Sequence, residues 1–243
     1  MQFFSLSDCG KRRTNNEDFA IAEAFKDYII LILADGMGGH NGGEVASGCG
    51  AKTALSCIKS KLKGTSTPQE ILDILSKAVK RANLEILAEA QAQASLEGMG
   101  TTMDVCVIKG KNAYIAHVGD SRVYKVGADE KITQITRDHS LVEFMLESGA
   151  ITPEEAQHHP QKNVITRALG TNSSIEVDTF TTDIAEGDKL LMCSDGLTNM
   201  VEETRISKIV ASQESLEKIA HTLVSEANTK GGVDNITVIV AGC

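Results

Sequence analysis

The stretch IILILADGMGG, residues 29–39, decides the fold of this chain. Its apolar residues from Ile29 to Ala34 predict a buried β-strand, and Asp35 follows directly, before a series of glycines that favours a turn. Burying a carboxylate at the end of a strand lowers stability by several kcal/mol unless a cation or hydrogen bonds compensate its charge. Repeats of this arrangement would therefore mark a set of carboxylates with a common task.

The arrangement of an apolar strand and an aspartate at a turn recurs three times. Strands run into Asp120 within VGDSR and into Asp195 within SDGL, and Asp234 within GGVDN precedes the last predicted strand. Taken singly, Asp-Gly is a common hairpin turn pair. Four such sites, with few lysines or arginines nearby, instead favour a divalent cation. Oxygen ligands without His or Cys favour Mg²⁺ or Mn²⁺ over Zn²⁺.

Groups of strands alternate with pairs of helices along the chain. We expect the strands between 101 and 135 to form one antiparallel meander. Grouped strands and paired helices predict an α+β fold with two stacked antiparallel sheets and helices outside them, rather than a doubly wound parallel sheet. The predicted strands are 18–25, 28–34, 101–108, 113–117, 122–126, 132–135, 175–180, 189–193 and 235–240. One helix is predicted to begin near 43, and four more are predicted at 67–94, 141–148, 153–157 and 216–227.

Composition limits the classes of function. The 243 residues contain no linker or repeat, which predicts a single domain over residues 1–243. The net charge of -9 and the absence of any basic run argue against a nucleic-acid partner. No apolar stretch is long enough for a membrane span, and the first residues lack the order of a secretory signal, so we expect a cytoplasmic protein without a membrane partner. We also expect a monomer.

The segment RTNNED, residues 13–18, adds a guanidinium and two carboxylates. As a surface turn it would be unremarkable. Beside a metal centre, Arg13 could bind phosphate oxygens with its planar fork, while Glu17 and Asp18 hold metal-bound waters.

Six motifs together resemble the metal-dependent serine/threonine protein phosphatases of the 2C type, the PPM family. They occur in the family's order and with similar separations, and they cover nearly the whole chain. The DGMGGH form of the second motif resembles the bacterial branch. The motifs are Arg13-x-x-x-Glu17-Asp18, ADGMGGH at 34–40, GTT at 100–102, VGDSR at 118–122, SDGL at 194–197 and G-x-DN at 232–235.

The resemblance implies a four-layer αββα sandwich with two divalent cations, Mn²⁺ or Mg²⁺, in a cleft at the sheet edges. Asp35 would bridge the cations, the Gly36 carbonyl would bind one of them, and Asp195 and Asp234 would hold the other. Glu17 and Asp18 would act through coordinated waters, and Arg13 would bind the substrate phosphate. Asp120, with Asp195, corresponds to a third cation site of bacterial relatives, and residues 141–166 correspond to a variable flap.

The chain departs from the family pattern at Met37. Animal members have at this position a histidine that is thought to protonate the leaving group. A water on a third cation held by Asp120 is our candidate acid, with His40 or bulk water as alternatives.

Three functions agree with these residues. The first is a phosphatase of phosphoserine and phosphothreonine proteins that attacks with a metal-bridging water and reverses a Ser/Thr protein kinase. The second is a catalytically silent binding module, which loss of a metal aspartate would signal. The third is a hydrolase of small phosphate esters or nucleotides. A cysteine phosphatase is disfavoured because the chain has no Cys-x5-Arg loop.

Overall fold

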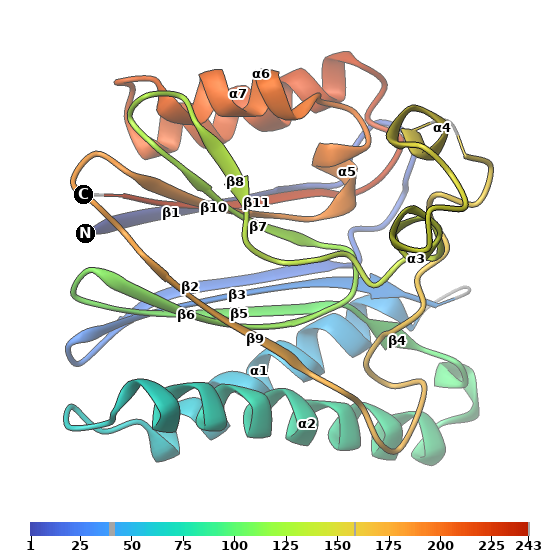
Figure 1. The fold of residues 1–243 in the computed structure, drawn as a ribbon. Coiled ribbons are helices and arrows are strands. Elements are labelled where there is room, and N and C mark those ends of the chain that lie inside the picture. Colours follow the sequence, from blue (N-terminus) through green and yellow to red (C-terminus); the bar gives the residue numbers. More distant parts are fainter. Residues whose placement is uncertain (39–41, 158, 243) are drawn as a thin grey trace.

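Two antiparallel sheets pack face to face, and helices cover both outer faces (Figure 1). The computed structural model describes residues 1–38, 42–157 and 159–242. The first sheet contains, in spatial order, Gln2–Asp8 (β1), Ile236–Gly242 (β11), Lys189–Cys193 (β10), Arg122–Val126 (β7) and Ile132–Gln134 (β8). The second contains Asp18–Phe25 (β2), Tyr28–Met37 (β3), Met103–Lys109 (β5), Asn112–Val118 (β6) and Asp178–Asp183 (β9), with Gly100–Thr101 (β4) paired to β3.

Paired helices form the two outer layers. Gly43–Lys61 (α1) and Pro68–Ala92 (α2) cover the second sheet, and Glu203–Ala211 (α6) and Leu216–Thr229 (α7) cover the first (Figure 1). Asp195–Thr198 (α5) is a single turn at one end of the sandwich. The predicted α+β fold with four αββα layers is therefore confirmed.

Strand β3 is apolar along its length because both of its faces are buried. Leu31 and Leu33 pack in the core between the two sheets, whereas Ile30 and Ile32 pack against α1 and α2. Successive strand residues point to opposite faces, so a strand in a middle layer needs apolar residues at every position. The strand continues three residues beyond its predicted end at 34, to Met37.

Helix α2 begins where its capping residues predict. Thr67 and Glu70 form a reciprocal capping box, and Pro68 is the first helical residue. The helix buries Ile71, Leu75, Ala78, Ala82 and Ile86 along one face. It ends at Ala92, two residues before the predicted end, and a short 3₁₀ turn follows at Ala94–Leu96.

The prediction of one meander between residues 101 and 135 is wrong. Strands β5 and β6 belong to the second sheet, and β7 and β8 belong to the first. The chain changes sheets at Gly119, whose φ of 120° suits glycine, and a Cβ there would lie 2.5 Å from the Thr102 side chain. This crossing places Asp120 at the end of the sandwich, between the sheets.

Three elements escaped the sequence analysis, and one strand was placed too early. Strand β1 and helices α5 and α6 had no predicted counterpart. Strand β9 begins at 178 rather than 175, because its partner β6 ends at Val118 and the first pair of the ladder is Asp178 with His117. Both β1 and β9 are edge strands with much of their surface exposed, so their apolar pattern is weak.

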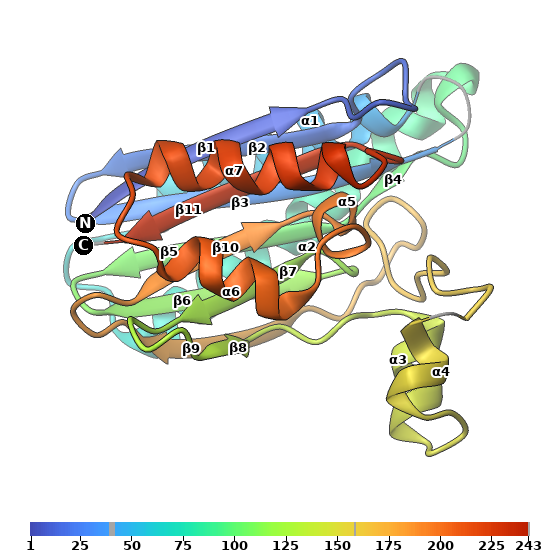
Figure 2. The same ribbon diagram turned by 90° about the horizontal axis from the view of Figure 1, so that it is seen from above.

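The segment predicted as a flap, 141–166, carries the short helices Leu141–Glu147 (α3) and Pro153–Gln157 (α4). Figure 2 shows both helices standing away from the sandwich. Its two ends run side by side, with Leu141 donating a backbone hydrogen bond to Val164. Across the described ranges, no helix combines the length and apolar character needed to cross a membrane.

Candidate active site

The aspartates singled out in the sequence lie close enough to raise one another's pKa. Helix α5, which Asp195 begins, lies at the end of the sandwich opposite the chain termini (Figure 1). Asp18 begins β2 and faces Asp35 of β3 in the sheet register. Asp195 begins α5 just after β10, and Asp234 lies just before β11. Antiparallel neighbours bring the start of one strand beside the end of the next, so residues distant in sequence meet at one edge.

Asp35 is fixed through its backbone by a pair of threonines. Its amide donates to Oγ1 of Thr102 at 2.9 Å, and its carbonyl accepts from the Thr102 amide at 2.8 Å and from Thr101 Oγ1 at 2.9 Å. Thr102 Oγ1 in turn lies 3.0 Å from Ser121 Oγ, beside Asp120. The Thr101-Thr102 pair, which the sequence analysis left without a chemical role, thus sets the position of Asp35.

Asp18 is the most deeply buried of these carboxylates, at 7% exposure. Ser194 Oγ donates to its Oδ2 at 2.8 Å, while Oδ1 is buried and has no hydrogen-bond partner among the described residues. Next to Ser194, the Asp195 side chain accepts a hydrogen bond at Oδ2 from the side-chain Nδ2 of Asn199, at 2.9 Å. A buried carboxylate oxygen without a partner needs an explanation, and a cation in the site would supply one.

Arg13 reaches the site from the turn after β1. Its guanidinium donates to Asp234 Oδ2 at 2.9 Å, and the side chain is half exposed. The Asn235 side chain supports this side of the site. Its Nδ2 donates to the backbone carbonyls of Cys9 and Asn15, and its Oδ1 accepts from the backbone amide of Glu17. The guanidinium is therefore accessible to a ligand, while hydrogen bonds to Cys9 and Asn15 hold the backbone on both sides of Arg13.

Glu17 and Gly36 lie where the start of α1 approaches the sheet. The Gly36 amide donates to the Glu17 carbonyl at 3.1 Å, and Ser47 of α1 donates to the same oxygen at 2.6 Å. A Cβ on Gly36 would lie 2.2 Å from the Gly43 carbonyl, and a Cβ on Gly43 would lie 2.6 Å from the Glu17 carboxyl carbon. Only glycine permits so close an approach.

The carboxylates raise one another's pKa. Burial raises the pKa of Asp35 well above its ordinary value, and Asp18, Asp195, Asp120 and Asp234 add to the effect through their charges. Burial likewise raises the pKa of Asp195 to about 8, with Asp120, Asp234 and Asp18 contributing.

Burial also raises the pKa of Asp18 and of Asp120 to about 6, and the charge of Asp234 adds to the first shift and that of Asp138 to the second. Such mutual destabilisation shows that the charges share one region of low solvation.

The charge of the site suits divalent cations. Within the described ranges, no three His, Cys, Asp or Glu side chains converge into a ready-made ligand set. The buried Asp18 Oδ1 and the raised pKa of Asp35 and Asp195 nevertheless mark a region in which the described residues supply too little positive charge to compensate the carboxylates. All donors in it are oxygens, which agrees with Mg²⁺ or Mn²⁺.

A model of the protein phosphatase 2C family matches residues 8–231 of the chain. The chain belongs to the protein phosphatase 2C family. Over 238 residues the phosphatase is 41% identical to the serine/threonine phosphatase stp of Listeria monocytogenes, and this alignment covers 96% of this chain and 92% of the relative.

Solved structures give the same result for the fold. The S. agalactiae serine/threonine phosphatase matches with a TM-score of 0.90 and 36% identity, over 100% of this chain and 99% of that one. The catalytic domain of the phosphatase PstP in complex with 2 manganese ions matches with a TM-score of 0.86 and 37% identity, over 98% and 96% of the two chains. The protein is thus a serine/threonine protein phosphatase of the bacterial kind.

The fold of the phosphatase brings all of the predicted site residues to one end. Their ligand roles stay predictions. Gly39 and His40, which end the second motif, lie outside the described residues. Thr101, Thr102, Ser194 and Asn235 position the carboxylates and were missed as positioning residues, although all four stand inside motifs that the sequence analysis quoted.

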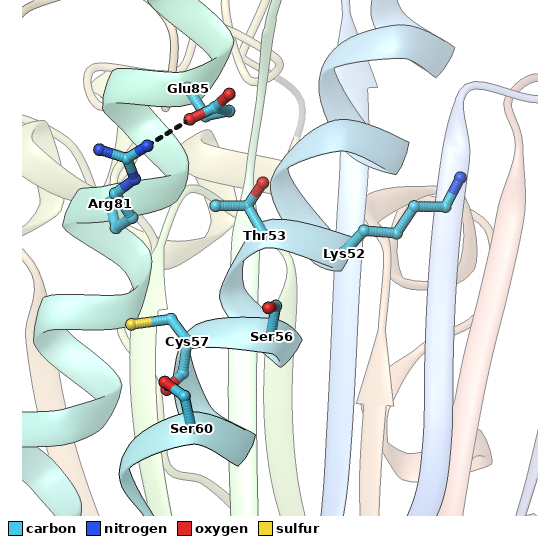
Figure 3. A pocket seen from close by; sticks show the side chains of 7 residues that line it. All are labelled: Lys52, Thr53, Ser56, Cys57, Ser60, Arg81 and Glu85. Carbon is cyan, nitrogen blue, oxygen red and sulfur yellow. Dashed lines mark hydrogen bonds and ion pairs between the residues drawn. The ribbon is translucent and has the colours of Figure 1, made fainter.

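A groove of about 460 Å³ lies elsewhere on the phosphatase, between α1 and α2. Figure 3 shows its lining, in which Arg81 pairs with Glu85 at 2.8 Å beside the hydroxyls of Thr53, Ser56 and Ser60. None of the predicted site residues lines it, so it is separate from the acidic end of the sandwich.

Proposed function

We propose that the protein hydrolyses phosphoserine and phosphothreonine in proteins with the help of two divalent cations, Mn²⁺ or Mg²⁺. The observation that carries the proposal is the group of buried carboxylates whose charges raise one another's pKa, with Arg13 at its edge. Asp35, Asp195, Asp234 and the Gly36 carbonyl would hold the cations, and Glu17 and Asp18 would hold their waters. When bound, such cations supply a water of lowered pKa as the nucleophile and positive charge for the phosphoryl oxygens.

Arg13 would orient the phosphate. A guanidinium offers two parallel N–H donors that match two phosphate oxygens. Its partner, Asp234 Oδ2, lies in a partly exposed side chain. The Arg13 guanidinium can therefore keep one N–H donor on Asp234 and direct its other N–H donors toward a ligand. Thr101 and Thr102 would keep Asp35 in place, because both form hydrogen bonds with its backbone.

The substrate implies the reaction that precedes this one. Phosphoserine and phosphothreonine proteins arise by phosphoryl transfer from a nucleotide to a hydroxyl, so a Ser/Thr protein kinase must act before this phosphatase. We place both activities in the cytoplasm and expect the phosphatase to act as a monomer.

The substrate class is tested by comparing phosphothreonine peptides with nucleoside phosphates in the presence of Mn²⁺. We expect kcat/KM to be at least about tenfold higher for the peptides, since the half-exposed Arg13 side chain is accessible to a phosphate group carried by a polypeptide. Initial rates of phosphate release measure both. A higher kcat/KM for nucleotides would favour a hydrolase of small phosphate esters.

A second prediction concerns the proton that a serine or threonine oxygen needs as it leaves. The Met37 thioether carries no proton to give. Asp120 is our candidate for the residue that holds the proton donor, through a third cation site shared with Asp195. Asp120→Asn should therefore slow hydrolysis of a phosphothreonine peptide at least about tenfold more than hydrolysis of p-nitrophenyl phosphate, whose leaving group needs no proton.

The measurement is kcat for both substrates at saturating Mn²⁺, with Mn²⁺ binding followed by calorimetry. Two strongly bound cations should remain in Asp120→Asn. An equal drop in kcat for both substrates would remove Asp120 from proton delivery and return the role to His40 or bulk water.

A further inference from the structure

Two basic residues beside the site have no part in the proposed chemistry. Lys11 and Arg12 precede Arg13 in the turn after β1, and both are exposed. Among the described residues neither side chain forms a salt bridge, whereas Arg13 pairs with Asp234. A third exposed basic residue, Lys230, directly follows α7 and precedes the loop that carries Asp234. We call Lys11 and Arg12 the basic rim.

The turn that carries Lys11 and Arg12 is fixed to the site. Its amides donate to the Gly232 carbonyl, from Lys11 at 2.7 Å and from Arg12 at 3.2 Å. Gly10 has a φ of 77°, and a Cβ there would lie 2.2 Å from the Asp234 carbonyl. The backbone of the rim is therefore held against the Asp234 loop. The Lys11 and Arg12 side chains thus start from fixed backbone positions beside Arg13, which would bind the phosphate.

Charge changes sign across the site. Figure 2 shows the turn after β1 on one side of this end of the sandwich and helices α3 and α4 on the other. The two flap helices carry only acidic charges, Glu143, Glu147, Glu154 and Glu155, and Arg137 pairs with the first two of them. In a chain of net charge -9, the basic rim is thus a local exception.

We infer that the basic rim binds aspartate or glutamate side chains that flank the phosphorylated residue of the substrate. The inference rests on the proposed function and names its preferred substrates. Consecutive Cα atoms lie about 3.8 Å apart, so the Cα atoms of Lys11 and Arg12 are within about 8 Å of that of Arg13. Acidic residues within about three positions of the phosphorylated residue would reach them, and Glu154 and Glu155 of the flap, which are not paired with Arg137, would disfavour the same residues on that side.

The test uses three phosphothreonine peptides of equal length with Mn²⁺. One has two glutamates before the phosphothreonine, one has them after it, and one has glutamines in both places. We expect one acidic peptide to have kcat/KM about threefold to tenfold above the glutamine peptide, mainly through KM, because exposed ion pairs contribute modestly. The advantage should shrink at 0.5 M salt, where screening is strong.

Variants assign the preference to the rim. Lys11→Ala with Arg12→Ala should bring the ratio of acidic to neutral kcat/KM close to one, and glutamates at both positions should reverse it. Lys77→Ala with Lys80→Ala, two exposed lysines of α2, removes the same charge far from the site and should leave the ratio as it is. Mn²⁺-dependent thermal stabilisation shows that each variant is folded.

Three results would overturn the inference: equal kcat/KM for all three peptides, a preference that survives the double alanine variant, or the same loss in the α2 variant. Failure of the unchanged protein to hydrolyse any of the peptides would overturn the proposed function itself, and the rim would fall with it.

Discussion

Asp35→Asn is expected to lower kcat at least about a thousandfold while the protein stays folded. The carboxylate stands at the centre of the acidic group, where four other aspartates act on its pKa. Cations at such a centre contribute several kcal/mol to stabilisation of the transition state, and each 1.36 kcal/mol is a factor of ten in rate. Asparagine keeps the shape and the backbone contacts to Thr101 and Thr102 but removes the charge.

Stability should move in the opposite direction from activity. Burial and like charges raise the pKa of Asp35, so its ionised form destabilises the metal-free fold at neutral pH. Without metal, Asp35→Asn should therefore unfold at a temperature equal to or above that of the unchanged protein. Asp195→Asn should behave in the same way, because burial raises the pKa of Asp195 to about 8.

Two variants serve as contrasts. Arg13→Ala removes a phosphate contact but no carboxylate, so it should raise KM more than it lowers kcat. Asp73→Asn lies on the exposed face of α2, away from the site, and should change neither constant. A fully active Asp35→Asn protein would show that the acidic group is not the catalytic centre.

The aspartates could be predicted from sequence, but their meeting point depended on topology. An apolar strand that ends in Asp-Gly is visible in one dimension, and Asp35 and Asp195 were found in this way. That Asp120 joins them depends on Gly119, where the chain leaves one sheet for the other. A meander predicted from turn residues alone missed this crossing, because a turn residue does not reveal which strand the chain pairs with next.

Positioning residues were harder to predict than charged ones. Thr101 and Thr102 indicate only a strand start, since a threonine hydroxyl has many uses. Their role follows from the pairing of β3 with β4, which brings the backbone of Asp35 to their hydroxyls. Asn235 likewise joins Cys9, Asn15 and Glu17, partners more than 200 positions away that no local pattern could indicate.

Removal of metal is the second change with a large expected effect. Glu17, Asp18, Asp35, Asp195 and Asp234 with Arg13 carry a formal charge of -4 when all of them are ionised, and even with some carboxylates protonated the metal-free site is acidic and repels a dianionic phosphate. Chelation should therefore abolish both hydrolysis and binding of the phosphate product.

Thermal unfolding gives a readout that does not depend on activity. The pKa of Asp195 is raised to about 8 and that of Asp18 to about 6, both above the ordinary value of 3.8, mainly by burial. The metal-free fold then binds more protons than the unfolded chain, so its stability falls as pH rises from about 4 to about 8. Mn²⁺ should raise the Tm more at pH 8 than at pH 6, because protons compete with the cation at the lower pH.

The most direct measurement is release of phosphate from a phosphothreonine peptide by protein that has been treated with a chelator and dialysed, before and after Mn²⁺ is added. We predict that the metal-free protein is folded by circular dichroism and inactive, and that Mn²⁺ restores turnover. Metal-free protein that hydrolyses the peptide at the rate of the Mn²⁺-loaded protein would contradict a metal-dependent phosphatase.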